Sequence, residues 1–146
     1  MDVTTVIINY QTPDYLEKSV TSFKKFYANI PLLIIDNGSK DESLKVIDKL
    51  ENKFEHLRSQ RLNKNIFHGP AMDLAARELV HSKYIFFLDS DTETRKGGFL
   101  ENMLNFFMLL SNCEQCFHAT SIVVLLLLFQ ESCNSFEWPS LHDGLG

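Results

Sequence analysis

The sequence has no lysine or arginine after Lys96, although 14 of its 146 residues are of these types. Five of its 19 acidic residues follow that position, so the last 50 residues carry the whole net charge of −5. Neither part of the chain has the basic excess that is typical of nucleic-acid binding. We therefore expect no nucleic-acid partner, and the change in charge indicates a carboxyl-terminal segment of a different kind.

Long apolar segments and cysteine-rich motifs are also lacking. The longest apolar run, Ile122–Phe129, is too short to cross a bilayer, and the amino terminus does not have the pattern of a signal peptide. We expect no transmembrane segment and a cytoplasmic protein, either free or peripheral at the membrane. Cys113, Cys116 and Cys133 do not form the two close ligand pairs of a zinc site, so they are interpreted as ordinary thiols.

Glycine-rich phosphate-binding motifs are absent as well. The sequence contains neither Gly-x-Gly-x-x-Gly after its first predicted strand nor a Gly-x-x-x-x-Gly-Lys-Ser/Thr loop. These absences argue against a dinucleotide cofactor and against a P-loop. A bound phosphate would therefore need a metal ion to neutralise its charge.

The most informative segment that is present is Tyr84–Asp91, in which five apolar residues are followed by Asp-Ser-Asp. An unbroken apolar run is typical of a strand that is covered on both faces in a parallel sheet. Asp89 and Asp91 would then lie at the carboxyl end of the strand, where α/β sheets bind ligands. Neighbouring carboxylates suit Mg²⁺ or Mn²⁺, and the alternative is that one of them only caps the following turn or helix.

Strands and helices alternate along the sequence. Apolar runs predict strands at residues 3–8, 32–35, 57–62 and 84–88. Helical spacing predicts helices after residue 12, after residue 39, at 71–80 and through roughly residue 110. This order predicts an α/β fold of the Rossmann-like type, with a mostly parallel sheet and helices on both faces.

Local signals indicate where two helices begin. Thr12 is expected to be the N-cap of the first helix, with Pro13 at the first helical position. Ser39 and Glu42 fit a capping box for the second helix. The capping box argues against the alternative that Asp-Asn-Gly at residues 36–38 is a hairpin turn.

Three of the predicted strands end in polar residues: Asn9-Tyr10, Asp36-Asn37 and Asp89-Ser90-Asp91. Because the carboxyl ends of parallel strands share one sheet edge, we expect these residues to line one crevice. A phosphatase that uses Asp89 as nucleophile is an alternative, since Asp-x-Asp resembles the haloacid dehalogenase-type enzymes. That family has Thr or Val where Glu93 stands and usually places this strand first, so we rank the phosphatase lower.

Five motifs together resemble the nucleotide-binding half of family 2 glycosyltransferases with the GT-A fold. They are Val6–Tyr10, Tyr15–Val20, Ile34–Asp41, Asn65–Ala71 and Phe87–Asp91. The resemblance extends over about residues 3–105. It implies a GT-A-like nucleotide-sugar-binding domain at residues 1–105, followed by a divergent tail at residues 106–146 that is truncated or altered.

The resemblance implies a role for each of these residues. Tyr10, Asp36 and Asn37 would contact the nucleobase or ribose of a nucleotide sugar, with a UDP-sugar favoured by analogy. Asp89 would face the ribose or the water shell of a Mg²⁺ or Mn²⁺ ion, and Asp91 would ligate that ion at the diphosphate.

The loop between the third strand and the following helix would lie against the nucleotide. Its candidate residues are Lys64, Asn65, His68 and Gly69, and a solvated surface position is the alternative for Lys64 and His68. Asp73 stands where the family often has Asn near the ribose, and a carboxylate on a helix surface is the alternative there.

The family resemblance implies an inverting, hexosyltransferase-type reaction on an acceptor hydroxyl of a glycan, lipid or protein that the sequence does not identify. Such a reaction needs a general base, and no residue matches it, Glu131 and Glu137 being guesses. The catalytic residue is therefore unassigned, and a non-catalytic nucleotide-sugar-binding remnant is the alternative function. An uncovered sheet edge would favour a homo-oligomer, although residues 122–129 could add a strand there.

Overall fold

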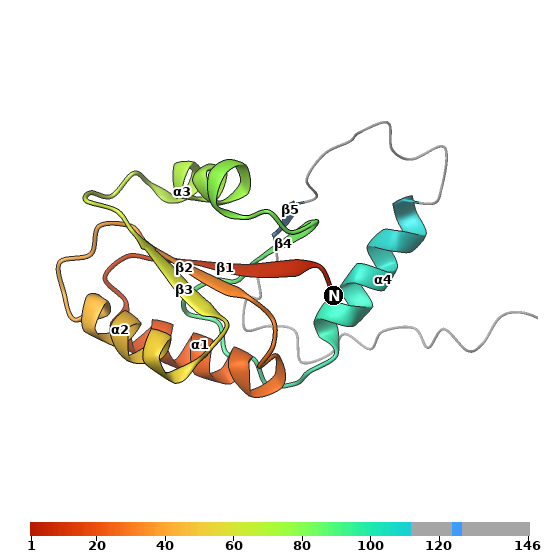
Figure 1. The fold of residues 1–146 in the computed structure, drawn as a ribbon, viewed down its shortest axis with the longest axis horizontal. Helices are drawn as coiled ribbons and strands as arrows, with labels where there is room; N and C mark the ends of the chain where they lie inside the picture. Colours follow the sequence, from red (N-terminus) through yellow and green to blue (C-terminus); the bar gives the residue numbers. More distant parts are fainter. Residues whose placement is uncertain (112–123, 127–146) are drawn as a thin grey trace, which may run out of the picture.

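The computed structural model describes residues 1–111 and 124–126 (Figure 1). One sheet of five strands has the order β3-β2-β1-β4-β5, and each of its described pairings is parallel. The strands are β1 (Val3–Asn9), β2 (Leu32–Asp36), β3 (Leu57–Arg61), β4 (Tyr84–Phe87) and β5 (Val124–Leu126). The sheet thus has the predicted α/β character, with its first strand at the centre.

Helices cover both faces of this sheet, as predicted. Figure 1 shows α1 (Pro13–Phe26) and α2 (Ser43–Lys53) on one side and α3 (His68–Leu74) on the other. A π-helical turn, η1 (Ala75–Leu79), continues α3, and α4 (Phe99–Ser111) follows β4. In the part of the chain that is described, no helix is long and apolar enough to span a bilayer.

Two hydrophobic clusters lie between the sheet and the helices on its two faces. The larger one joins α1, α2 and α4 to one face of the sheet and contains the fully buried Phe23. The smaller one lies beneath α3 and η1, where Ala71 and Ala75 are fully buried against Val6 and Ile35. Alternate residues of β1 and β2 enter opposite clusters, because successive side chains of a strand point to opposite faces.

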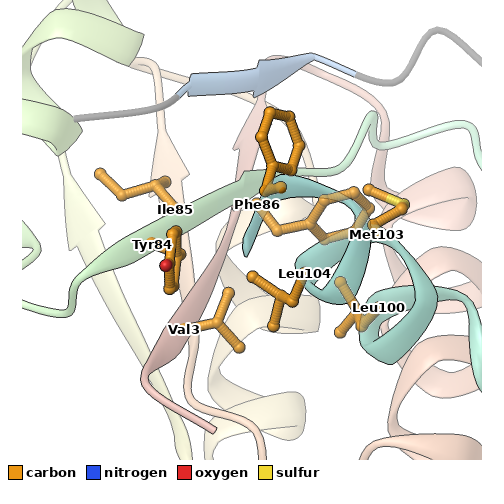
Figure 2. Close-up of a pocket in the computed structure, with 8 residues that line it drawn as sticks. Val3, Tyr84, Ile85, Phe86, Leu100, Met103 and Leu104 are labelled. Atoms are coloured by element: carbon orange, nitrogen blue, oxygen red, sulfur yellow. The ribbon is translucent and has the colours of Figure 1, made fainter. Parts of the chain in front are cut away.

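A small apolar pocket lies between α4 and the amino-terminal parts of β1 and β4 (Figure 2). Val3 and Tyr84, the first residues of their strands, line it together with Leu100 and Leu104 of α4. The pocket is therefore at the end of the sheet opposite to the predicted polar edge. Its apolar lining belongs to the core beneath α4 and does not resemble a site for a charged ligand.

The predicted strands are present within one or two residues of their expected bounds, but some helix starts differ. Thr12 is the N-cap residue and Pro13 is the first helical residue, yet no side chain caps α1. The predicted capping box is wrong, because α2 begins at Ser43 without a capping hydrogen bond from Ser39 or Glu42.

The third helix begins at His68, inside the segment that was predicted to be a loop, and it ends in the π-helical turn. Within the possible edge strand at residues 122–129, the described residues form β5 (Val124–Leu126), which pairs with β4. The division of the chain at residue 105 stays a prediction. The tail cysteines lie outside the described residues, as do Glu131 and Glu137.

Lys24 is a buried cation beneath the amino-terminal ends of β2 and β3. Its side chain is only 3% exposed, and Nζ donates to the carbonyl oxygens of Ala28, Ile30 and His56 at 3.2, 2.6 and 3.2 Å. Burial lowers the pKa of Lys24 to about 8. The three acceptors belong to the segments that enter β2 and β3, so this lysine joins both of these segments to α1.

We expect Lys24→Met to lower the free energy of unfolding by about 1–3 kcal/mol, because buried carbonyl groups lose their donor. Urea unfolding measures the change, and Lys18→Met on the exposed face of α1 is the matched control. The lysine is protonated less readily in the folded state, so the wild-type protein should gain stability relative to the variant as pH rises from about 8 to 10.5. Equal stability of the two variants would contradict this role.

Candidate functional site

The carboxyl ends of β1, β2 and β4 meet at one edge of the sheet. Asn9 pairs with Asp36 in the register of β1 and β2, and the backbone N–H of Asn37 donates to the carbonyl of Asn9 at 2.8 Å. On the other side of β1, the N–H of Leu88 donates to the carbonyl of Val6 at 2.9 Å. The predicted convergence of these strand ends is confirmed.

Asp36 lies at the centre of a buried network of hydrogen bonds. Its carboxylate accepts from Asn9 Nδ2 through Oδ1 and from the backbone N–H of Ser39 through Oδ2, both at 3.0 Å. The residue is only 1% exposed. Both carboxylate oxygens therefore have partners inside the protein, and Asp36 holds the turn that follows β2.

Ser39 and Thr12 connect this turn to its neighbours. Ser39 Oγ accepts from the backbone N–H of Gln11 at 3.0 Å and lies 3.3 Å from Asn9 Nδ2. Thr12 Oγ1 donates to Asn9 Oδ1 at 2.9 Å and lies 3.3 Å from Ser90 Oγ. The loop after β1 is thus joined to the turn after β2 and to the loop after β4.

A second set of hydrogen bonds holds the loop that follows β3. Asn37, which is 2% exposed, accepts from the N–H of Ile66 at 2.9 Å and donates to Asn65 Oδ1 at 3.1 Å. Gly38 has a φ of +79° and faces the backbone of Lys64 so closely that an added Cβ would lie 2.5 Å from its carbonyl carbon. The turn after β2 therefore fixes loops on both of its sides.

Asp89 and Asp91 follow β4 at the same edge. Asp89 is half-buried and Asp91 is exposed. Burial raises the pKa of Asp89, the charge of Asp91 raises it further, and the charge of His68 opposes these two effects. The ionised form of Asp89 is thus less favourable in the folded protein than in water, and a cation would stabilise it.

Serine side chains of α1 support the loop that carries these carboxylates. Ser19 Oγ donates to the carbonyl of Asp89 at 3.2 Å, and Ser22 Oγ accepts from the N–H of Thr94 at 3.0 Å. Among the described residues, no group of three or more His, Cys, Asp or Glu side chains could hold a metal ion. A cation at Asp89 and Asp91 would therefore keep positions for water or phosphate oxygens, which is typical of Mg²⁺ sites.

The remaining predicted residues lie around this edge with different exposure. Tyr10 is 43% exposed directly after β1, and Lys64 is exposed in the loop after β3. Asp73 forms an ion pair with Arg77 one turn along the helix, on the exposed surface. This pairing fits the alternative interpretation of Asp73 as a helix-surface carboxylate.

The local sequence did not indicate the hydrogen bonds of Ser39 and Thr12 or the backbone conformation of Phe67. Ser39 and Thr12 were interpreted as helix caps, because hydroxyl side chains before a helix usually cap it. Phe67 received no role, although its backbone has a φ of 69° and its side chain is 77% exposed. The serine that follows Asp-Asn-Gly was a usable signal for the network, but nothing in the local sequence indicated the backbone conformation of Phe67.

Comparisons with known proteins agree with this fold. The family model Glycosyl transferase family 2 matches residues 4–110. An uncharacterised glycosyltransferase of Haemophilus influenzae is 35% identical over 104 residues, covering 68% of this chain and 39% of the relative. The chain thus spans well under half the length of this curated relative.

Solved structures show the same fold. A mannosyltransferase from Pyrobaculum calidifontis, in complex with GDP-Man and Mn²⁺, has a TM-score of 0.66 at 14% identity over 73% of this chain and 32% of its own. TarS of S. aureus has a TM-score of 0.58 at 20% identity over 76% of this chain and 20% of its own. At these identities the similarity shows the GT-A-like fold alone.

We expect Gly38→Ala to lower the free energy of unfolding by more than about 2 kcal/mol. The substitution combines a left-handed φ with a Cβ that overlaps the backbone of Lys64. Gly69→Ala is the matched control, because a Cβ there meets nothing within 4 Å, and it should change stability by less than about 0.5 kcal/mol. Urea unfolding of both variants measures the difference, and similar values for the two would contradict the close approach.

Proposed function

The chain belongs to glycosyl transferase family 2, and from that premise we propose that the polar edge of its sheet binds a nucleotide sugar together with a divalent cation. The observation that carries this proposal is the position of Asp89 and Asp91. They follow β4 at the edge of the sheet where Asp36 connects the ends of β1 and β2. These carboxylates supply the hard oxygen ligands that Mg²⁺ and Mn²⁺ prefer.

The electrostatics of Asp89 support the cation. The pKa of this carboxyl is raised by burial first and by Asp91 second, and His68 compensates these effects only in part. We assign Asp91 as the direct ligand and Asp89 as its partner. When bound, the cation neutralises the diphosphate and the charge that develops on the leaving nucleoside diphosphate.

The other contacts to the nucleotide sugar are assigned from the exposure of the side chains. We assign Tyr10 to the nucleobase side and Lys64 to the nucleotide, because both side chains are exposed beside the turn after β2. Asp36 and Asn37 are positioning residues in this proposal, since their side-chain atoms are already hydrogen-bonded within the protein. By family analogy we propose uridine as the nucleoside. Guanosine is the second candidate, because the structurally similar mannosyltransferase binds GDP-Man.

Transfer to an acceptor requires a general base, and none is assigned among the described residues. An inverting, hexosyltransferase-type reaction in the cytoplasm is the activity that we propose for a protein with this edge and a complete acceptor site. The alternative is a module that binds the donor without transferring it. It is the function that the donor edge would support by itself.

Asp91→Asn should weaken the Mn²⁺-dependent binding of UDP and GDP by more than about tenfold. Loss of a residue that only supports a metal ligand already lowers metal affinity by about that factor, and loss of the ligand itself should lower it at least as much. Isothermal titration calorimetry with and without EDTA measures the change. Glu93→Gln is the matched control, since it removes the same charge from an exposed position two residues away. Equal binding by wild-type protein and Asp91→Asn would overturn the metal site.

Asp89→Asn should raise the stability of the protein at pH 7 when divalent cations are absent. The pKa of Asp89 in the folded protein lies above the ordinary value of 3.8. As pH rises from 3.8 through the folded pKa, ionisation of Asp89 lowers the stability of the protein, and this loss is complete above the folded pKa. The gain should disappear below about pH 3.8, where both states are protonated.

Urea unfolding at both pH values measures this effect, and added Mn²⁺ should stabilise the wild-type protein more than Asp89→Asn. A variant that is less stable than the wild type at pH 7 without cations would contradict the unfavourable charge at Asp89.

A further inference from the structure

Phe67 combines an unusual backbone conformation with high exposure. Its φ of 69° and ψ of 165° lie in a region that is essentially restricted to glycine. Its side chain is 77% exposed, the highest value among the exposed large hydrophobic residues of the described chain. The described structure thus holds an aromatic ring in solvent at a position where glycine would fit with less strain.

The strained backbone is held by the turn after β2. The N–H of Phe67 donates to Asn65 Oδ1 at 2.7 Å, and the same oxygen accepts from Asn37 Nδ2 at 3.1 Å. The carbonyl of Phe67 accepts from the N–H of Ala71 at 3.2 Å, in the first turn of α3. Hydrogen bonds on both sides of the residue therefore fix the backbone conformation from which the ring projects.

The location of Phe67 places it at the rim of the proposed donor site. On one side, its loop packs against Gly38 through the backbone of Lys64 and is hydrogen-bonded to Asn37. On the other side, the next residue, His68, lies close enough to Asp89 for their charges to interact. The ring is thus attached between the turn after β2 and the carboxylates after β4.

The side chains of Asp36 and Asn37 are poorly available to read the edge of a nucleobase. Both oxygens of Asp36 and both polar atoms of Asn37 already have partners, and neither residue is more than 2% exposed. Recognition of the base then has to use another kind of contact at this rim. Exposed rings supply it, because bases stack on aromatic side chains whatever their hydrogen-bonding pattern. Tyr10, after β1, and Phe67, after β3, are exposed rings on the loops that the turn after β2 joins, and Phe67 is the more exposed of the two.

We propose that Phe67 is the platform on which the nucleobase of the donor stacks. This inference rests on the proposed function and adds to it a residue that determines how the base is held. Stacking tolerates different bases, so the site should accept both uracil and guanine, with guanine favoured by its larger surface. The strained backbone of Phe67 is then explained by the exposed ring that it presents at the rim.

The test compares Phe67→Leu with Phe67→Tyr in the full-length chain. The leucine keeps an apolar side chain without a ring, whereas the tyrosine keeps the ring. Isothermal titration calorimetry with saturating Mn²⁺ gives the dissociation constants of UDP, GDP and inorganic pyrophosphate. Phe106→Leu, which alters another exposed phenylalanine on α4, is the matched control.

Phe67→Leu should weaken the binding of UDP and GDP by about 5- to 150-fold and leave pyrophosphate binding unchanged. Phe67→Tyr and Phe106→Leu should bind all three ligands as the wild type does. Wild-type nucleotide affinity in Phe67→Leu would overturn the inference while leaving the proposed function intact. An equal loss for pyrophosphate would also overturn it, since the ring would then act on the diphosphate or the cation.

Two further measurements keep the outcomes distinct. If wild-type protein binds pyrophosphate with Mn²⁺ but neither nucleotide, the inference fails and the metal site survives. If it binds none of the three ligands, the proposed function fails as well.

Phe67→Gly should be at least as stable as the wild type in urea unfolding, because glycine adopts this backbone conformation readily. A clear loss of stability would show that the ring packs within the protein, which would overturn its role as a platform.

Discussion

The buried hydrogen-bond network of the turn after β2 is the interaction on which the rest of the site depends. Asp36 joins this turn to Asn9 of β1, and Asn37 joins it to the loop that follows β3. The two non-glycine residues of the described chain with positive φ, Gln11 and Phe67, lie on these two loops. Each is held by a side-chain oxygen that belongs to this network or contacts it. Because an unpaired polar group in a buried position is costly, the network specifies one arrangement of the rim.

Around this network the protein keeps features that its own stability does not require. Asp89 has an ionised form that burial and Asp91 both disfavour, and Phe67 exposes an apolar ring on a strained backbone. Both features are at the carboxyl edge of the sheet, while the opposite end contains the apolar pocket of Figure 2 and the buried Lys24. Strain and unfavourable charge are typical of ligand sites, where a ligand supplies the missing interaction. This distribution supports a donor and a cation at one edge of a fold whose other parts serve packing.

Much of the fold could be predicted from the sequence, because buried parallel strands have a simple signal. The runs at Val3–Asn9, Leu32–Asp36 and Tyr84–Phe87 consist mainly of apolar and β-branched residues, and each is covered on both faces. Helix starts were less predictable. Ser39 and Glu42 match a capping box in sequence, yet Ser39 is hydrogen-bonded to the loop after β1 and α2 begins later. A local pattern cannot reveal that a distant backbone N–H competes for the same hydroxyl group.

The sequence by itself determined the order of strands and helices, the parallel character of the sheet, and the three polar strand ends that share its edge. These features depend on hydrophobic periodicity and on short connections, both of which are local properties of a chain. Only the tertiary structure decided that Asp36 and Asn37 use their side chains inside the protein, that Asp89 is half-buried beside Asp91, and that Phe67 is exposed in a glycine-type conformation. Several of these facts depend on contacts between distant residues, as between Asn9 and Asp36 at a separation of 27 and between Asn37 and Ile66 at a separation of 29, and such contacts form only when the strands assemble.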